Sequence, residues 1–325
     1  MLDLKMSLAV ALLSLATGGA GIAGCGTGGQ QNSAQTNRGA NQNSATPKPS
    51  PVRSGGESGE SGGDIKVLTQ GSYNLVGEPF VAVARDAQTY QELRRLDDNL
   101  PILKEEEFKR IAVVAAFLGE RRTGGYQIEM TRAPDGDVRV KETTPPKDAM
   151  LTQALTRPYK IVSVPVQDEG RLKVEVGEPW RSAARPYKLE SGEFTMTGGF
   201  AGRRETMRLE GTMTVMRHDN LATIFFNLQG TGGAKARELK ETATGIVQAG
   251  GGALRLARFN AGTLVEPPAN LLTAKGEFTN NAANLTLALD SLPSNIADGY
   301  QGTGRLSATA TGPPPPKKAG MRDEG

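Results

Sequence analysis

Alternation of apolar and polar residues with a period of two restricts the fold of this chain more than any other feature. Across residues 207–215, methionine, leucine, glycine and valine alternate with arginine, glutamate and threonine, as in a strand with one buried face. A second apolar segment, 221–228, follows the polar residues Arg217-His218-Asp219-Asn220. Two such segments on either side of a short polar loop predict an antiparallel hairpin.

Short segments rich in strand-forming residues continue this pattern, and no long helical period interrupts them. We expect strands at 254–259, 272–274, 285–289 and 305–309. Regular short strands with glycine-rich turns predict that residues 186–311 form an all-β antiparallel sandwich or a barrel-like domain. The sequence Gly-Glu-Phe-Thr occurs at both 192–195 and 276–279, which we interpret as chance.

The preceding region, residues 64–176, has the pattern of a β-rich domain with one helix. A continuous apolar run at 110–118 predicts a buried central strand. We expect a helix capped by Asp86 or Thr89, because Thr89-Tyr90-Gln91-Glu92 fits a capping box. Further strands are expected at 65–68, 79–84, 126–130, 138–140, 159–164 and 171–176. The fold class predicted for the whole chain is therefore mainly β, or α+β.

The first 25 residues have the features of a targeting segment. Lys5 precedes an apolar run at 8–16 that is too short to span a bilayer. The run leads into Ile22-Ala23-Gly24-Cys25, which resembles the lipobox of bacterial lipoproteins. In that family the cysteine is acylated and the signal peptide before it, here residues 1–24, is removed. The alternative is an ordinary cleaved signal peptide in which the cysteine has no role.

The lipobox resemblance implies a lipid-anchored protein of the bacterial cell envelope that faces the periplasm or the exterior. Because Gly26 rather than aspartate follows Cys25, the sorting rule of Gram-negative lipoproteins implies the outer membrane. Residues 25–63 are almost wholly small and polar, so they bury too little surface to order and predict a disordered tether. Residues 312–325 begin with a proline run and predict a disordered tail.

Composition excludes several kinds of chemistry. One cysteine and one histidine rule out an intramolecular disulfide, a Cys/His zinc site and a mechanism with two histidines. With 38 basic and 35 acidic residues, the net charge of +3 is too balanced to indicate a nucleic-acid partner. His218-Asp219 is interpreted as a turn, and Asp135-Gly136-Asp137 lacks the further oxygen ligands that calcium needs. We expect no catalytic residue, no metal and no cofactor, so the protein is predicted not to be an enzyme.

Two other features are interpreted as structural. The run Glu105-Glu106-Glu107 is expected to be a solvated segment before the buried strand. Trp180 lies between the two predicted domains, and we expect it to pack between them rather than to stack on a ligand.

Three motifs follow one another in the first domain. They are a Thr-Gly-Gly-Tyr turn within 117–128, a Glu-Thr-Thr-Pro segment within 140–146, and an Arg-Pro-Tyr sequence within 151–162. Together they resemble the C-terminal domain of PrcB-type protease-complex accessory proteins over roughly residues 80–165. The resemblance implies a non-catalytic, protein-binding module that helps to stabilise a protease complex, with a secreted or envelope protease as the partner.

The Thr-Gly-Gly-Tyr turn could contact that partner, since adjacent glycines permit close backbone approach and tyrosine is a rigid interface anchor. The candidate partner-binding residues are Thr123, Gly124, Gly125, Tyr126, Arg157, Pro158 and Tyr159. Alternatively the turn is structural, with Tyr126 on the core and Pro158 at the start of a strand. The turn and Arg157-Pro158-Tyr159 also resemble two loops of chagasin-like peptidase inhibitors. A further hypothesis is an envelope carbohydrate- or lipid-binding lipoprotein acting through residues 186–311.

Overall fold

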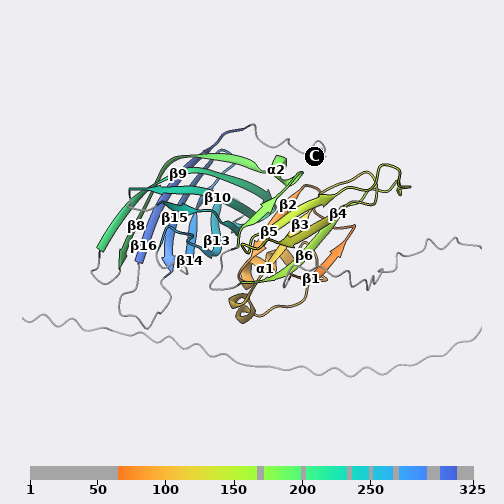
Figure 1. Cartoon of the computed structure of the whole chain (residues 1–325), viewed down its shortest axis with the longest axis horizontal. Helices are drawn as coiled ribbons and strands as arrows, with labels where there is room; N and C mark the ends of the chain where they lie inside the picture. The colour runs from red at the N-terminus through yellow and green to blue at the C-terminus, as the bar shows by residue number, and fades with distance from the viewer. Residues whose placement is uncertain are drawn as a thin grey trace, which may run out of the picture. The chain divides into compact units, whose positions relative to one another are not determined.

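The computed structural model describes residues 65–166, 172–198, 203–232, 236–248, 252–265, 271–290 and 301–312. The predicted signal peptide, Cys25, the predicted tether and the tail beyond Gly312 lie outside the described residues. The described residues form two parts, an N-terminal part up to β7 and a C-terminal part from α2 onward, that belong to one compact unit. Both are drawn in Figure 1.

A four-stranded antiparallel sheet forms the centre of the N-terminal part, counting the residues that the structure describes. Its order is β1 (Lys66–Gly71), β6 (Tyr159–Pro165), β3 (Ile111–Phe117) and β2 (Phe80–Ala84). Strand β3 lies between two neighbours and is buried from its second residue to its last, which confirms the central strand predicted from its apolar run. Strand β2 is an edge strand of this sheet.

A helix and a smaller sheet complete the N-terminal part. Helix α1 (Ala87–Arg94) begins after Asp86, whose Oδ1 accepts a hydrogen bond of 2.6 Å from the Thr89 backbone nitrogen. The capping box at Thr89 was therefore wrong, because Thr89 lies inside the helix and Asp86 is its cap. The smaller sheet contains β4 (Gln127–Arg132), β5 (Val138–Thr143) and β7 (Val174–Val176), with β7 parallel to β5.

The acidic run before β3 forms a short 3-10 helix, η1 (Glu105–Lys109), rather than an irregular segment. Glu105 and Glu106 are exposed, as expected for a solvated segment. The Glu105 carboxylate also accepts from the Ala87 backbone nitrogen at 3.0 Å, and Glu107 accepts from that of Lys104 at 2.7 Å. These carboxylates therefore cap the starts of α1 and η1.

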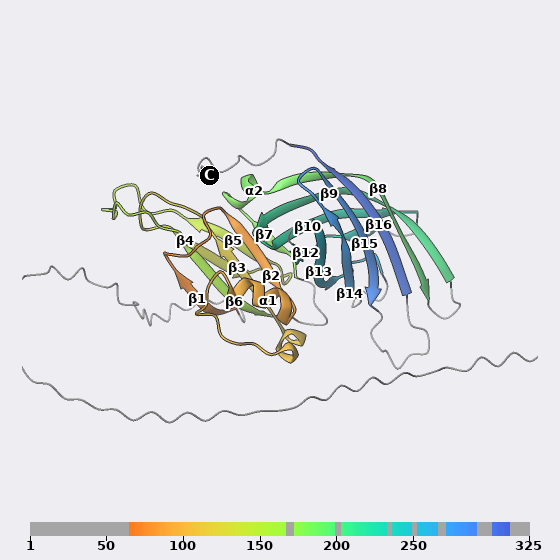
Figure 2. The same ribbon diagram turned by 180° about the vertical axis from the view of Figure 1, so that it is seen from behind.

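In the described stretches of the C-terminal part, a short helix, α2 (Trp180–Ala183), precedes nine antiparallel strands. They are β8 (Arg185–Gly198), β9 (Arg203–His218), β10 (Leu221–Thr231), β11 (Arg237–Leu239), β12 (Thr242–Val247), β13 (Ala253–Asn260), β14 (Leu271–Phe278), β15 (Ala282–Asp290) and β16 (Gln301–Ala310). Each pairs with the next along the chain, except that β11 and β12 both pair with β10, along successive lengths. Strand β16 pairs with β8, so the sheet closes into a barrel with eight positions around its ring (Figures 1 and 2).

The barrel settles the choice that the sequence left open between a sandwich and a barrel. The predicted hairpin at 207–228 is confirmed as β9 and β10, with Asp219 in the turn at φ 49°. The interior is filled by alternating side chains from all sides of the ring. Phe194 covers Gly302 and Gly304, where an added Cβ would lie 2.8 and 2.7 Å from the ring.

The outer face of β10 and β12 is buried rather than polar, because the N-terminal part packs on it. Strand β10 begins with four buried residues, Leu221 to Ile224, and Leu221 belongs to the same apolar core as β2 and β3. Thr223 and Thr244 lie on this face, with hydroxyl oxygens 2.7 Å apart. The His218 ring lies 5.6 Å from that of Phe80, also across the boundary.

The two threonines satisfy the free edge of β2. The Val83 backbone nitrogen donates to Thr244 Oγ1 at 2.7 Å, and Thr223 Oγ1 donates to the Val81 carbonyl at 2.7 Å. Because the Thr223 hydroxyl donates its proton to the Val81 carbonyl, the Thr244 hydroxyl must be the donor in the bond between the two threonines. Each hydroxyl therefore donates one hydrogen bond and accepts one.

Trp180 closes the core at the start of the C-terminal part. Its side chain is fully buried, and its Nε1 donates to the Phe117 carbonyl at 2.8 Å. The expected packing role is confirmed, because Trp180 belongs to the core that contains β2, β3 and residues Met216 and Leu221 of the barrel.

We predict that Thr244→Val lowers the free energy of unfolding by about 1–3 kcal/mol, because it leaves the Val83 N–H buried without an acceptor. Urea denaturation of the full chain measures this. The matched control is Thr206→Val, since Thr206 makes a similar bond to Thr195 but is exposed. We expect that control to change stability by less than about 0.5 kcal/mol. Equal losses for both variants would contradict the role given to the boundary threonines.

Candidate functional site

The Thr-Gly-Gly-Tyr turn lies in the loop between β3 and β4 and is bonded to the segment that leads into β6. Arg121 and Thr156 exchange two backbone hydrogen bonds of 2.8 Å, and the Thr156 hydroxyl donates to the Thr123 carbonyl at 3.0 Å. The Gly124 nitrogen donates to the Thr152 carbonyl at 3.0 Å. The structure therefore brings together the predicted residues at 123–126 and those at 157–159, which are far apart in the sequence.

The two glycines of the turn are required by this packing. An added Cβ on Gly124 would lie 2.5 Å from the Thr152 hydroxyl. Gly125 has φ +88°, and its added Cβ would lie 2.9 Å from Pro145 and 3.0 Å from Leu151. Gly125 thus combines a left-handed backbone with a close approach by neighbouring side chains.

Arg121 holds Tyr126 in place. The guanidinium carbon lies 5.5 Å from the centroid of the Tyr126 ring, and Nε donates to the Glu142 carboxylate at 2.9 Å. Tyr126 is partly buried and packs on the core of the N-terminal part. This is the packing expected if the turn is structural, and the exposed part of the ring is what a partner could contact.

Of the predicted partner-binding residues at 157–159, two are buried in the core and one is at the surface. Pro158 and Tyr159 are buried, and the Tyr159 ring stacks on Phe117 at 6.2 Å. Burial raises the pKa of the Tyr159 hydroxyl. Arg157 is partly exposed and forms an ion pair of 3.2 Å with Glu120. Within this set, Arg157 is therefore the side chain that an incoming protein could reach.

Sequence reasoning did not find the exposed apolar side chains around this loop, because they lie between strands where no periodicity marks them. Tyr73 and Leu75 are 67% and 75% exposed, and Met150 and Leu155 are also exposed. The Ser72 carbonyl accepts from the Arg157 nitrogen at 2.7 Å, which places the first two beside the loop. We call Tyr73, Leu75, Met150 and Leu155 the loop patch. Exposed apolar groups of this kind are typical of protein contacts.

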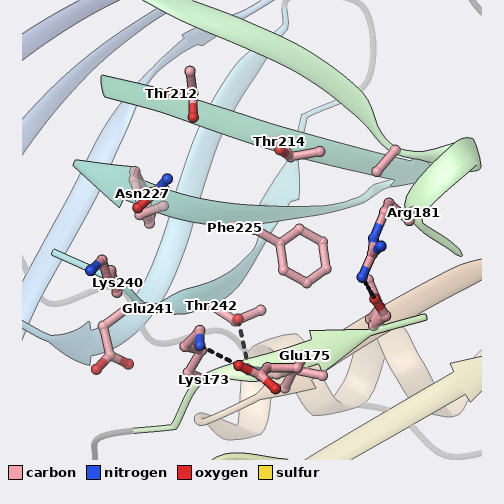
Figure 3. A pocket seen from close by; sticks show the side chains of 14 residues that line it. Lys173, Glu175, Arg181, Thr212, Thr214, Phe225, Asn227, Lys240, Glu241 and Thr242 are labelled. Carbon is pink, nitrogen blue, oxygen red and sulfur yellow. Dashed lines mark hydrogen bonds and ion pairs between the residues drawn. The ribbon is translucent and has the colours of Figure 1, made fainter. Parts of the chain in front are cut away.

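A cleft of about 600 Å³ lies on another surface, between β7 and the outer face of β9 and β10 (Figure 3). Lys173 donates to Glu175 at 2.6 Å and to Asp137 at 3.2 Å. The bond to Glu175 raises the pKa of Lys173, and the same bond lowers the pKa of Glu175. At neutral pH both groups are charged, so the ion pair is formed.

Behind the cleft, a buried ion pair joins the two parts. Arg85 and Glu241 lie 3.7 Å apart, with side chains 7% and 1% exposed. Burial lowers the pKa of Arg85, and the charge of Glu241 acts in the opposite direction. Glu241 also accepts from the Leu172 backbone nitrogen at 3.2 Å, so the pair fixes the chain that leads into β7.

The features that resemble catalytic or metal sites are turns. His218 Nε2 lies 3.5 Å from Asp219 in the β9–β10 hairpin, as the turn interpretation predicts. Asp135-Gly136-Asp137 turns β4 into β5, with Gly136 at φ +86°. Among the residues that the structure describes, no group of three or more His, Cys, Asp or Glu side chains could hold a metal ion.

Comparison with known proteins found a family match for one segment of the N-terminal part. The PrcB C-terminal family matches residues 112–165, from the start of β3 to the end of β6. All three sequence motifs lie inside this range, so the resemblance predicted over roughly residues 80–165 is confirmed for residues 112–165. No curated protein and no solved structure matches the chain.

The described residues contain no helix that is both long and apolar enough to cross a membrane.

We predict that Gly125→Ala destabilises the chain more than Gly136→Ala. The two glycines have nearly the same positive φ, so the backbone strain is matched. Near Gly136 the added Cβ approaches nothing closer than Arg132 at 3.8 Å, whereas at Gly125 it meets two side chains. Urea denaturation should show an additional loss of about 1–3 kcal/mol for Gly125→Ala. Equal losses would indicate that Pro145 and Leu151 move aside freely.

Proposed function

We propose that this protein is a membrane-anchored bacterial lipoprotein whose N-terminal part binds and stabilises an envelope protein within an extracytoplasmic protease complex. The match of the PrcB C-terminal family to residues 112–165 carries this proposal. The protein acts by binding and is not itself an enzyme. This agrees with the turn geometry of its one histidine–carboxylate pair.

Anchoring through Cys25 is supported by the sequence alone. An apolar run followed by Ile22-Ala23-Gly24-Cys25 is the pattern of a lipoprotein signal. Several acyl chains on one cysteine provide stable attachment, since each buried CH₂ contributes about 0.8 kcal/mol. The polar tether at 25–63 would then let the folded unit reach a partner at the membrane surface.

The proposed contact surface is the loop patch together with Tyr126 and Arg157. These residues lie on loops that are bonded to one another, and those loops are held by the glycine turn. The family match includes the loops at 119–126 and 144–158.

The two alternative functions have less support from the geometry. A chagasin-like inhibitor needs exposed loops, but Pro158 and Tyr159 are buried. A carbohydrate- or lipid-binding barrel needs an open interior, but the buried apolar side chains of the described barrel strands pack into one core cluster.

We predict that Cys25→Ser moves the protein from the membrane fraction to the soluble fraction and abolishes incorporation of labelled palmitate. Cell fractionation after a carbonate wash measures the first effect. Thr27→Ser, two residues further on, is the matched control and should remain in the membrane. A Cys25→Ser protein that stays in the washed membrane would contradict lipid anchoring at this residue.

We predict that cross-linking in the native cell captures a secreted or envelope peptidase, or a subunit of its complex. Tyr126→Ala combined with Arg157→Ala should reduce this capture several-fold, because both contact side chains are shortened. Leu75→Glu gives an independent test, since Leu75 is largely exposed and the substitution removes little packing.

Arg305→Ala, on an exposed position of β16, is the control and should leave capture unchanged. Deletion of the whole protein should lower the amount of the captured peptidase. An unchanged set of partners in all the loop variants would contradict the proposed surface. Inhibition of that peptidase by the purified chain would favour the inhibitor alternative.

A further inference from the structure

Strand β7 presents an edge to the cleft described above. Its other edge pairs in parallel with β5, with Val138 opposite Val174 and Val140 opposite Val176. The Val138 nitrogen donates to the Lys173 carbonyl at 2.9 Å, and the Gly177 nitrogen donates to the Val140 carbonyl at 3.0 Å. In a parallel ladder this register directs the backbone groups of Val174 and Val176 away from β5.

The hydrogen bonds of Val174 and Val176 confirm that their backbone groups point away from β5. The Val174 nitrogen donates to Thr242 Oγ1 of the barrel at 3.0 Å, across the inner end of the cleft. At the other end, the Arg181 guanidinium lies 3.4 Å from the Val176 carbonyl. Within the described residues, the Val174 carbonyl and the Val176 N–H between these ends make no hydrogen bond to another strand. They form one acceptor and one donor on the same edge.

The walls of the cleft suit an extended peptide. Phe225 points into it from β10, and Thr212 and Thr214 line it from β9, as Figure 3 shows. These side chains offer an apolar surface with hydroxyl groups beside it. The volume of about 600 Å³ lies within the range of sites that bind small molecules or short chains.

The charge of the cleft favours an acidic ligand. Of its cations, Lys173 pairs with Asp137 and Glu175, and Lys240 pairs with Glu238 at 2.8 Å. Arg181 is exposed, and among the described residues no carboxylate lies within ion-pair distance of it. A guanidinium in this setting is suited to a carboxylate of the ligand.

We propose that this cleft binds an extended peptide segment as a strand parallel to β7, with an acidic group on its C-terminal side. One peptide residue donates its N–H to the Val174 carbonyl and accepts from the Val176 N–H. A parallel chain then runs towards Arg181, which binds an acidic side chain or the terminal carboxylate. Addition of a strand to an exposed edge is a general mode of peptide recognition.

The proposed peptide site is separate from the loop patch and goes beyond the proposed function. Its test uses the purified full chain and a fluorescein-labelled peptide amide, Gly-Ser-Val-Thr-Val-Glu, in fluorescence polarisation. The peptide with glutamate at the opposite end, Glu-Ser-Val-Thr-Val-Gly, also as the amide, should bind about tenfold more weakly, since its carboxylate lies away from Arg181. Gly-Ser-Val-Thr-Val-Gln as the free acid and as the amide distinguishes a terminal carboxylate from an acidic side chain.

Arg181→Gln should also weaken binding of the acidic peptide by about tenfold, whereas Arg305→Gln, an exposed arginine on β16, should not. Amide hydrogen exchange adds a readout that does not depend on a variant. Peptide should protect the Val176 N–H, while the Glu175 N–H, directed towards β5, should not change. Absence of binding at about 1 mM peptide, equal binding by Arg181→Gln, or an unprotected Val176 N–H would each overturn the proposal.

Discussion

The hydrogen bonds that Thr223 and Thr244 make to the edge of β2 are the interaction on which the arrangement of the described chain depends. An unpaired strand edge buried in an apolar boundary would leave backbone groups without partners, at a cost of about 1–3 kcal/mol each. The threonine hydroxyls supply those partners without a further strand. The barrel can therefore pack its outer face directly against the edge of the neighbouring sheet.

This boundary also explains why the cleft exists. Thr242 and Glu241, which come just before Thr244 in the chain, also provide side-chain acceptors for buried backbone groups. They accept from the backbone nitrogens of Val174 and Leu172. The edge of β7 is bonded at both ends to the C-terminal part, by Thr242 and by Arg181, and the candidate binding site lies along the backbone groups between them.

Much of the secondary structure was predictable, because it is encoded by local patterns. The strand at β3 follows from its apolar run, and the β9–β10 hairpin follows from alternation around Asp219. The sequence did not reveal β8, nor β11 and β12, which flank the irregular residues at 240–241. Strand β12 lacks alternation because both of its faces are buried, one in the barrel and one against β2. The prediction of an N-cap at Thr89 was wrong because aspartate and threonine both favour the N-cap position, so the sequence alone does not choose between Asp86 and Thr89.

The sequence by itself determined most of the segments that become strands, the turns between them, and that residues 112–165 are similar to the PrcB C-terminal family. Only the tertiary structure decided that the C-terminal strands close into a barrel, since closure joins β16 to β8 across more than a hundred residues of chain. It also decided that Tyr159 is buried while Arg157 is accessible, although the two residues are close in sequence. Burial and closure depend on contacts between distant segments, and local patterns of residues do not contain that information.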